Sequence, residues 1–312
     1  MNLAEACCPA CHEDRWTEVA PEDPSYTLHR CSRCGSYRIH PDKVAPALLY
    51  RDYYGGADAK RLTGIFDSIW RSRRQQKAAQ ILRGVPAGAR VLDVGCERGE
   101  LLNVLKGVGC RVAGTQLSQG AADYAREHFG IDVFVGELQD APFEAGSFDV
   151  ILMINVLEHL PDPESYLRRV AELLEPGGMF WVEVPNTGSF TARLSGKRWL
   201  HHDPPHHYWG FTIPGLRTML GRNGFDIERI HHVSWEHGPF GCLQSWLNFL
   251  PGPRNVVFDI VREGLSRQPG RLALQLVHGL LGALLLPLAV VTATVESLSG
   301  NGQVILLRLR RR

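Results

Sequence analysis

The chain has 312 residues, a formal net charge of +1 and 44% hydrophobic residues. It is long enough for one full domain and a small extra module. A charge balance so close to zero argues against broad electrostatic capture of nucleic acid. The first residues contain an acidic residue and clustered cysteines rather than a basic region followed by an apolar one, so we expect no secretory leader and a cytoplasmic protein.

Cysteines are paired at the start of the chain. Cys8-Pro-Ala-Cys11 and Cys31-Ser-Arg-Cys34 are two Cys-x-x-Cys pairs. Each tight turn can offer two thiolates, and four thiolates complete a tetrahedral zinc site that has no open position for a substrate. We therefore expect residues 1–45 to be a zinc ribbon in which the Zn²⁺ is structural, with Cys7 as an alternative to the ligand beside it.

Residues 46–84 should link the ribbon to the next domain. Apolar residues recur there at helical spacing, which predicts a helix packed on the core. A Tyr-Tyr-Gly-Gly turn comes before this helix. Its second aromatic residue, Tyr54, either covers a cofactor pocket as part of a lid or packs on the core.

Residues 85–184 alternate between strand and helix patterns. The expected strands are 91–94, 110–116, 131–135, 147–154 and 179–184, the expected helices are 100–108, 118–129 and 163–175, and a helix from 212 to 223 and strands 225–233 and 303–309 follow. Such alternation predicts an α/β fold with a doubly wound sheet. Sheets of this kind bind ligands at the carboxyl ends of their strands.

The motifs of this region resemble the class I S-adenosylmethionine-dependent methyltransferases. The segments that carry the resemblance are Val91–Gly99, Gly146–Asp149, Asn155–Leu160, Leu174–Gly178 and Val184–Asn186. The branch most similar to them contains the ubiquinone-type O-methyltransferases, and the resemblance covers about residues 85–235. It implies a Rossmann-like methyltransferase sheet, a methyl transfer reaction and S-adenosyl-L-methionine as cofactor.

The loop after the first strand is the part of this pattern that holds the methionine and ribose of the cofactor. The resemblance assigns that role to Asp93, Gly95, Cys96 and Gly99. Relatives usually have a small residue where this chain has Glu97. A carboxylate in the loop could instead meet the ammonium group of the cofactor.

Further cofactor contacts are implied at the ends of the later strands. The residues in these positions are Gln116, Glu137, Leu138, Ile154 and Asn155. Relatives usually have an acid at the first of them, so Gln116 replaces charge-assisted hydrogen bonds to the ribose with ordinary ones. The second and third would read the adenine edge, with Asp140 as an alternative.

Histidines provide the candidates for proton removal. His159 follows the fourth strand on the substrate side and titrates near neutral pH, so it is either a base or a residue that orients its loop. His206, His207 and Tyr208 belong to a Pro-Pro-His-His element that faces the pocket in similar methyltransferases. They are candidates for base or acceptor contact. A metal bound by the histidines of this stretch, among which no spacing singles out a set, and a merely structural loop are the alternatives.

Residues 239–300 look like a helical insertion before the last strand. Within it, 272–295 is a run of 24 residues without a formal charge, which is long enough to span a bilayer. A single crossing would separate the last strand from its sheet, so we expect a pocket cover, a subunit interface or a patch lying on the inner face of a membrane. Basic residues near the chain end would suit anionic headgroups: Arg308, Arg310, Arg311 and Arg312.

The sequence therefore predicts a methyltransferase built from five parts: 1–45 as zinc ribbon, 46–84 as linker or lid, 85–238 as catalytic core, 239–300 as apolar insertion and 301–312 as final strand. The expected acceptor is a hydroxyl on a small molecule, a glycan or a lipid-linked compound. RNA methylation with the ribbon as a clamp is the second hypothesis. A catalytically inactive binding subunit is the third, because Glu97 and Gln116 depart from the pattern.

Overall fold

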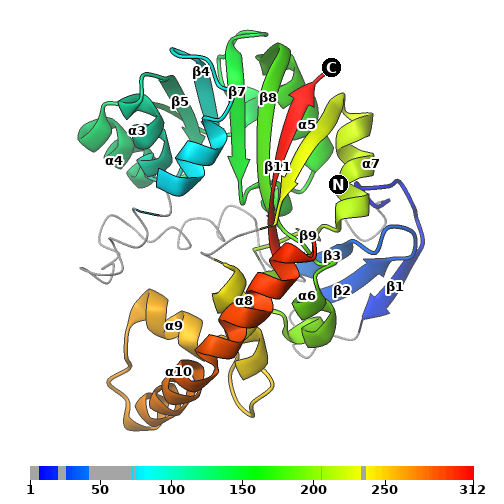
Figure 1. Ribbon diagram of the computed structural model, residues 1–312, viewed down its shortest axis with the longest axis vertical. Coiled ribbons are helices and arrows are strands. Elements are labelled where there is room, and N and C mark those ends of the chain that lie inside the picture. The colour runs from blue at the N-terminus through cyan, green and yellow to red at the C-terminus, as the bar shows by residue number, and fades with distance from the viewer. Residues whose placement is uncertain (1–6, 20–25, 42–71, 73–74, 205, 233–236) are drawn as a thin grey trace.

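A seven-stranded sheet forms the centre of the computed structural model, which describes residues 7–19, 26–41, 72, 75–204, 206–232 and 237–312 (Figure 1). Its strands are, in spatial order, β10 (Phe225–His231), β11 (Val304–Arg311), β8 (Leu174–Pro185), β7 (Phe148–Ile154), β4 (Arg90–Val94), β5 (Arg111–Gln116) and β6 (Asp132–Val135). Only β11 runs antiparallel to its neighbours. The expected doubly wound α/β sheet is confirmed.

Helices cover both faces of this sheet. One face carries α3 (Glu100–Gly107) and α4 (Gln119–Phe129), and the other carries α5 (Pro163–Leu173) and α7 (Ile213–Arg222) (Figure 1). Short side chains start three of these helices, since Ser118, Asp162 and Thr212 each accept a hydrogen bond from a backbone N–H of the first turn. Alternate residues of β4 enter the two apolar layers, as expected for a strand buried on both faces.

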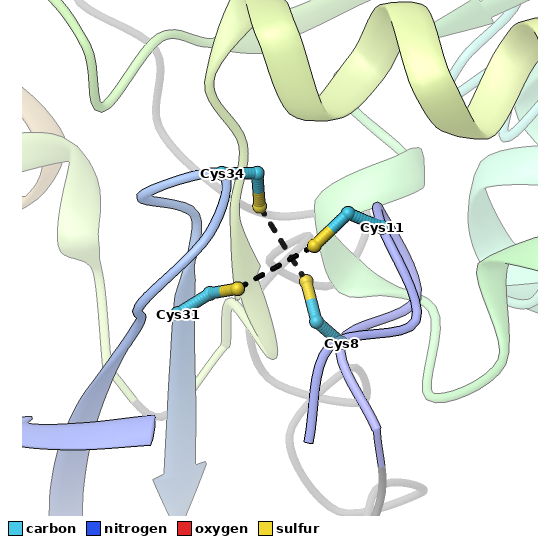
Figure 2. Close-up of side chains that lie close together, drawn as sticks. All are labelled: Cys8, Cys11, Cys31 and Cys34. Carbon is cyan, nitrogen blue, oxygen red and sulfur yellow. Dashed lines mark hydrogen bonds between the residues drawn. The ribbon is translucent and has the colours of Figure 1, made fainter. Parts of the chain in front are cut away.

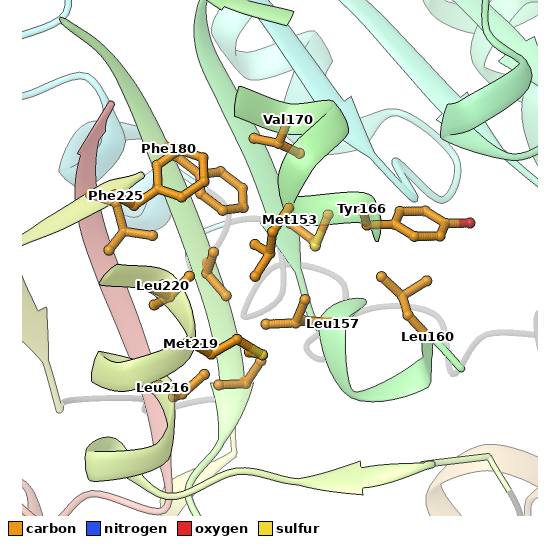
Figure 3. Close-up of a cluster of buried hydrophobic side chains, with 14 of the residues drawn as sticks. Met153, Leu157, Leu160, Tyr166, Val170, Phe180, Leu216, Met219, Leu220 and Phe225 are labelled. Carbon is orange, nitrogen blue, oxygen red and sulfur yellow. The ribbon is translucent and has the colours of Figure 1, made fainter. Parts of the chain in front are cut away.

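The larger apolar layer lies between the sheet and the second helix pair. Figure 3 shows Met153 of β7, Phe180 of β8 and Phe225 of β10 facing the side chains of α5 and α7. Phe180 and Phe225 pack with ring centroids 5.1 Å apart. This layer fixes β7 and the 3₁₀ turn Leu157–His159 that follows it, and so holds the carboxyl edge of the sheet in place.

Strand β8 begins earlier than expected. The sequence places the strand at 179–184 after a helix that reaches Pro176, but α5 ends at Leu173 and Leu174 already pairs with Phe148. The register shifts before the next pair, Val150 with Met179, so the Pro-Gly-Gly segment lies in a bulge. The breaker residues thus interrupt a strand rather than mark its start.

A second sheet contains β1 (Trp16–Val19), β2 (Tyr26–Cys31), β3 (Tyr37–Pro41) and β9 (Trp209–Gly210). The first three strands come from the cysteine-rich segment, whereas β9 belongs to the histidine-rich loop. β9 pairs with β3 through Tyr37 opposite Gly210. The ribbon and the catalytic domain therefore share a sheet.

Three helices project from one end of the molecule, away from the central sheet (Figure 1). They are α8 (Gly238–Leu247), α9 (Val256–Glu263) and α10 (Pro269–Leu298), and short helix α6 (Phe190–Ser195) packs against α8. The expected helical insertion before the last strand is present.

Candidate cofactor and acceptor site

Two hollows meet at the carboxyl ends of the parallel strands. The first, of about 470 Å³, is lined by Gly95, Gln116, Glu137, Leu138, Asn155, His159 and Tyr166 among others. The second, of about 810 Å³, is lined by Lys77, Asp93, Gly95, Cys96, Glu97, Glu100, Ile154 and Asn155 among others. Gly95 and Asn155 line both, so the hollows form one groove across the strand ends.

The glycine loop after β4 forms the wall between the two hollows. Gly95 has φ +72°, and a Cβ there would lie 2.7 Å from Val156 Cγ2, so no larger residue fits. Glu97 adopts φ +51°, the left-handed conformation that favours the glycine of relatives. Gly99 lines neither hollow; a Cβ there would lie 2.9 Å from Ala125 Cβ, so its absence permits the close approach of α3 and α4.

Carboxylates dominate the second hollow. Asp93, Glu97 and Glu100 line it together with a single lysine, and Lys77 is engaged by the buried Glu183 at 2.8 Å. Burial and the charge of Glu97 raise the pKa of Asp93 to about 8. The acidic residues of this hollow favour a cationic ligand over an anionic one such as a pyrophosphate.

Asn155 carries the chain over the edge of the groove after β7. Its backbone takes φ +53°, a conformation that Asn tolerates better than most residues. The backbone N–H donates to Glu183 O at 2.9 Å, and the side-chain amide donates to the Glu183 carboxylate at 3.1 Å. Ile154, which precedes it, lines the second hollow as expected.

Gln116 ends β5 at the wall of the first hollow. Its side-chain oxygen Oε1 accepts hydrogen bonds from Leu117 N at 2.6 Å and from Ser118 N at 3.2 Å. Its amide nitrogen is buried and has no hydrogen-bond partner among the described residues. A buried N–H donor of this kind calls for a ligand acceptor, and a ribose hydroxyl oxygen would supply one.

The far wall of the first hollow comes from the segment after β6. The Glu137 carboxylate accepts a hydrogen bond from the Tyr166 hydroxyl of α5, which fixes its orientation. Leu138 is fully buried and offers an apolar surface to a flat ring. Asp140, the alternative contact, lines neither hollow.

Two histidines face each other beside the groove. His159 Nδ1 donates to His206 O at 3.0 Å, and His207 Nδ1 donates to His201 O at 2.9 Å, because a carbonyl oxygen only accepts. Nε2 of each ring therefore carries the lone pair. The ring centroids are 4.5 Å apart. Burial and the neighbouring His207 lower the pKa of His159 to about 3, so this ring is neutral at physiological pH.

Glu158 completes this histidine pair. Both of its carboxylate oxygens are buried, and neither has a hydrogen-bond partner among the described residues. Burial raises its pKa to about 8. One donor atom each from Glu158, His159 and His207 lies within 4.8 Å of the others. The three groups can share a proton, and their two nitrogens and one oxygen could also hold a divalent cation.

The methyltransferase domain family matches residues 69–230, just over half of the chain. The chain belongs to this family. The match includes the glycine loop, the first hollow, the Glu158–His159 pair and the lining of the second hollow except His237. S-Adenosylmethionine is the methyl donor of such enzymes, and the acidic second hollow suits its positive charge.

Relatives of known activity support this assignment. The chain is 34% identical over 163 residues to a ubiquinone biosynthesis O-methyltransferase of Xanthomonas axonopodis, covering 48% of this chain and 68% of that one. It is 33% identical over 161 residues to the enzyme of the same name from Thiobacillus denitrificans, covering 48% and 69%. The solved structure of geranyl diphosphate C-methyltransferase from Streptomyces coelicolor matches with a TM-score of 0.50 at 15% identity, covering 77% and 76%, which shows a common fold.

The groove fits the cofactor of this methyltransferase family. Glu97 and Glu100, and Asp93 once it is ionised, would attract the ammonium and sulfonium charges, while Gly95 permits close backbone approach. The unpaired amide of Gln116 would donate to the ribose. In such a complex the replacement of the usual acid would change the direction of a hydrogen bond without removing the contact.

Several predicted residues lie away from the groove. Tyr208 is 3% exposed and packs in the core, and its backbone N–H donates a hydrogen bond to the backbone oxygen of Glu158 at 2.9 Å. His206 lines neither hollow, and its side chain lies 3.3 Å from Asp203. Of the Pro-Pro-His-His element, His207 alone belongs to the described cluster beside His159. Tyr54 lies outside the described residues.

The four predicted cysteines converge at the base of the ribbon (Figure 2). Sγ of Cys8 lies 3.6 Å from that of Cys34, and Sγ of Cys11 lies 3.5 Å from that of Cys31. A tetrahedral zinc site with Zn–S bonds of about 2.3 Å needs sulfur separations of about 3.8 Å, so the arrangement fits the metal. Cys7 is exposed and outside the cluster.

The structure places three residues at or beside the groove that the sequence did not single out. Lys77 and Glu183 form the ion pair at the wall of the second hollow, and Glu158 supplies the unpaired carboxylate. Glu158 stands beside His159 in the motif, so its position was visible. The sequence did not show that the Glu158 side chain points inward. Adjacent residues usually face different directions, whereas this 3₁₀ turn buries both Glu158 and His159.

Proposed function

We propose that this methyltransferase transfers the methyl group to a hydroxyl oxygen of a small-molecule acceptor, and that His159 receives the proton of that hydroxyl. The observation that carries the proposal is the position of His159, which lines the first hollow with Nδ1 held by His206 O. S-Adenosylmethionine supplies an electrophilic methyl group on a sulfonium. The groove positions donor and acceptor, and the buried rings exclude water.

Glu158 makes proton transfer to a ring of low pKa feasible. A neutral His159 is available as an acceptor at every physiological pH, but burial opposes the imidazolium that forms. Glu158, whose pKa is raised to about 8, lies within 4.8 Å, and its ionised form, which is present at mildly alkaline pH, would offset that penalty by its charge. In the proposed step the hydroxyl proton moves to His159 Nε2 while the new C–O bond forms and the C–S bond breaks.

The relatives favour a quinone-type acceptor, since their names place them in ubiquinone biosynthesis. We propose hydroxylated ubiquinone precursors as the first acceptors to test, with lipid-linked glycans next. We further propose that the four-cysteine ribbon holds one structural Zn²⁺ and that the enzyme works in the cytoplasm on the inner face of a membrane. The pairing of β3 with β9 would then let the metal brace the histidine loop.

The test is S-adenosylhomocysteine formation by the purified, zinc-loaded chain with these acceptors. His159→Gln should lower kcat at least a hundredfold and change the Kd of S-adenosylhomocysteine less than threefold. Glu158→Gln should lower kcat in the same way. Equal kcat in wild type and His159→Gln would remove the ring from the reaction.

A further inference from the structure

We propose that α10 and the adjoining α6 bind the surface of a membrane that contains anionic phospholipid. The inference is independent of the proposed reaction, because it rests on a different part of the chain. The outer face of α10 carries nine large apolar side chains that are each at least 45% exposed: Leu276, Val277, Leu280, Leu284, Leu286, Leu288, Val291, Val295 and Leu298. Helix α10 is long and apolar enough to cross a membrane by length and composition.

The polarity of α10 is inverted relative to a helix that packs on a water-soluble core. The residues it buries are small or polar: Gln275, His278, Gly282, Ala289, Ala293 and Glu296. Glu296 accepts from Thr191 N, and Gln275 accepts from Ser266 N at 2.7 Å, so the polar groups are used inside the module. Leu281 and Leu285 pack half-buried against α8, but nine large apolar side chains face outward while the polar groups are buried. Such a helix is suited to an apolar environment.

The width of the outer face favours lipid over a second copy of the chain. Successive residues of an α-helix are rotated by about 100°. When the nine exposed side chains are projected down the helix axis, Leu286 and Leu288 lie at the two edges of the face, with Leu276 between them, and the face spans roughly half of the circumference. A two-stranded helical interface uses a narrower stripe of a and d positions. The face extends from Leu276 to Leu298, the last residue of α10, which is a length of about 35 Å.

Helix α6 continues this surface at the carboxyl end of α10. Phe190 and Leu194 are 56% and 57% exposed, and the hydrogen bond from Thr191 N to Glu296 joins the two helices. Exposed Arg193 lies between the two apolar residues of α6. Exposed Arg267 precedes the other end of α10. Cations at both ends of an apolar face suit a surface with anionic headgroups.

The arginines near the chain end do not take this role. Arg308 and Arg310 both pair with Glu228 across β11 and β10, and Arg312 pairs with Asp226. They lie on the central sheet, at the opposite end of the molecule from the projecting helices (Figure 1). The expectation that they meet headgroups is therefore not supported by their place in the fold.

The connections of the module favour a helix that lies in the surface and does not cross it. Gln303, just before β11, donates to Gly238 O at the start of α8. Ser297, near the end of α10, donates to His232 O after β10. The segment that leads into the three helices and the segment that leaves them therefore lie side by side, and β10 pairs with β11 in one sheet. A single crossing would place these strands on opposite sides of the bilayer.

The test is sedimentation of the full, zinc-loaded chain with vesicles of neutral phosphatidylcholine, alone or with anionic phosphatidylglycerol. The triple variant Leu280→Glu, Leu284→Glu and Val291→Glu should bind anionic vesicles at least tenfold more weakly than wild type. Val108→Glu is the matched control, because this residue is 57% exposed but lies after α3 on the catalytic domain. It should bind as wild type, and thermal unfolding should show that all variants fold.

A second variant tests the headgroup preference. Arg193→Glu with Arg267→Glu should weaken binding to anionic vesicles at least fivefold and leave the weaker binding to neutral vesicles within twofold. Failure of the wild type to sediment with vesicles, or equal binding by the triple variant, would overturn the proposal. So would a stable wild-type dimer in light scattering that the triple variant dissolves, since the outer face would then join two copies.

Discussion

Lys77 forms a 2.8 Å ion pair with Glu183, and this pair fastens helical residues 75–81 to β8 at the wall of the acidic hollow. The side chains are 15% and 4% exposed, so the bond is largely screened from water. The same carboxylate accepts from Asn155 Nδ2 at 3.1 Å. One buried acid thus holds two sides of the cofactor groove together.

Lys77→Met should lower the free energy of unfolding by about 3–5 kcal/mol, because it leaves the Glu183 charge buried without its partner. Urea unfolding measures this change. The control is Asp123→Ala, which removes the ion pair to Arg126, whose side chains are 44% and 39% exposed, and should cost no more than about 1 kcal/mol. An equal loss of unfolding free energy in both variants would show that the buried Lys77 pair contributes no more to stability than an exposed ion pair.

Gln116→Glu should tighten S-adenosylhomocysteine binding up to about tenfold, because a carboxylate keeps the acceptor role toward Leu117 N and adds charge-assisted bonds to the ribose. Gln116→Leu should weaken binding by a similar factor through loss of both roles. Calorimetric titration gives the two Kd values. Weaker binding by the Glu variant would show that the amide donor is the group that this groove requires.

Cofactor affinity should rise with pH between 6 and 8, since Asp93 has a pKa of about 8 and only its ionised form attracts a cation. Binding should then release a proton, visible in calorimetry as a dependence on buffer ionisation heat. The raised pKa also makes Asp93 oppose folding as pH climbs from about 4 toward 8, because the folded state holds the proton longer. Asp93→Asn should flatten both profiles, and an unchanged proton release in that variant would assign it to another group.

Cys34→Ser should abolish zinc binding and lower both thermal stability and turnover, because the ribbon and the histidine loop share the β3–β9 pairing. Elemental analysis should give about one zinc per wild-type chain. Cys7→Ser is the matched control, since this cysteine is exposed and outside the cluster. A Cys34→Ser protein that keeps full activity would separate the metal from the catalytic loop.

The parts of the site that sequence reasoning located correctly are local in the chain. The turn after β4 was predictable because Gly95 and Gly99 mark it directly, and the cysteine pairs because each occupies one turn. Contacts between distant segments were not. Nothing near Trp209 signals that it pairs with Arg38, and Tyr208 looks like a site residue until the core closes over it.

The role of Gln116 shows a similar limit at a single position. Its place at the end of β5 followed from the strand pattern. From the sequence alone, however, the change from an acid to an amide indicates only that charge-assisted hydrogen bonds to the ribose are lost. The structure shows the carbonyl oxygen engaged by two backbone N–H groups, so the amide nitrogen must point elsewhere. The backbone of the next two residues determines which atom of the Gln116 side chain is already hydrogen-bonded. A pattern of residue types does not contain this information.

The position of β11 between β8 and β10 imposes an order on synthesis. Both neighbours are synthesised before residues 304–311 exist, so the nascent chain carries strand edges of β8 and β10 that have no partner yet. Such edges are prone to aggregate. Newly made chains should therefore depend on chaperones until translation supplies the strand that closes the sheet.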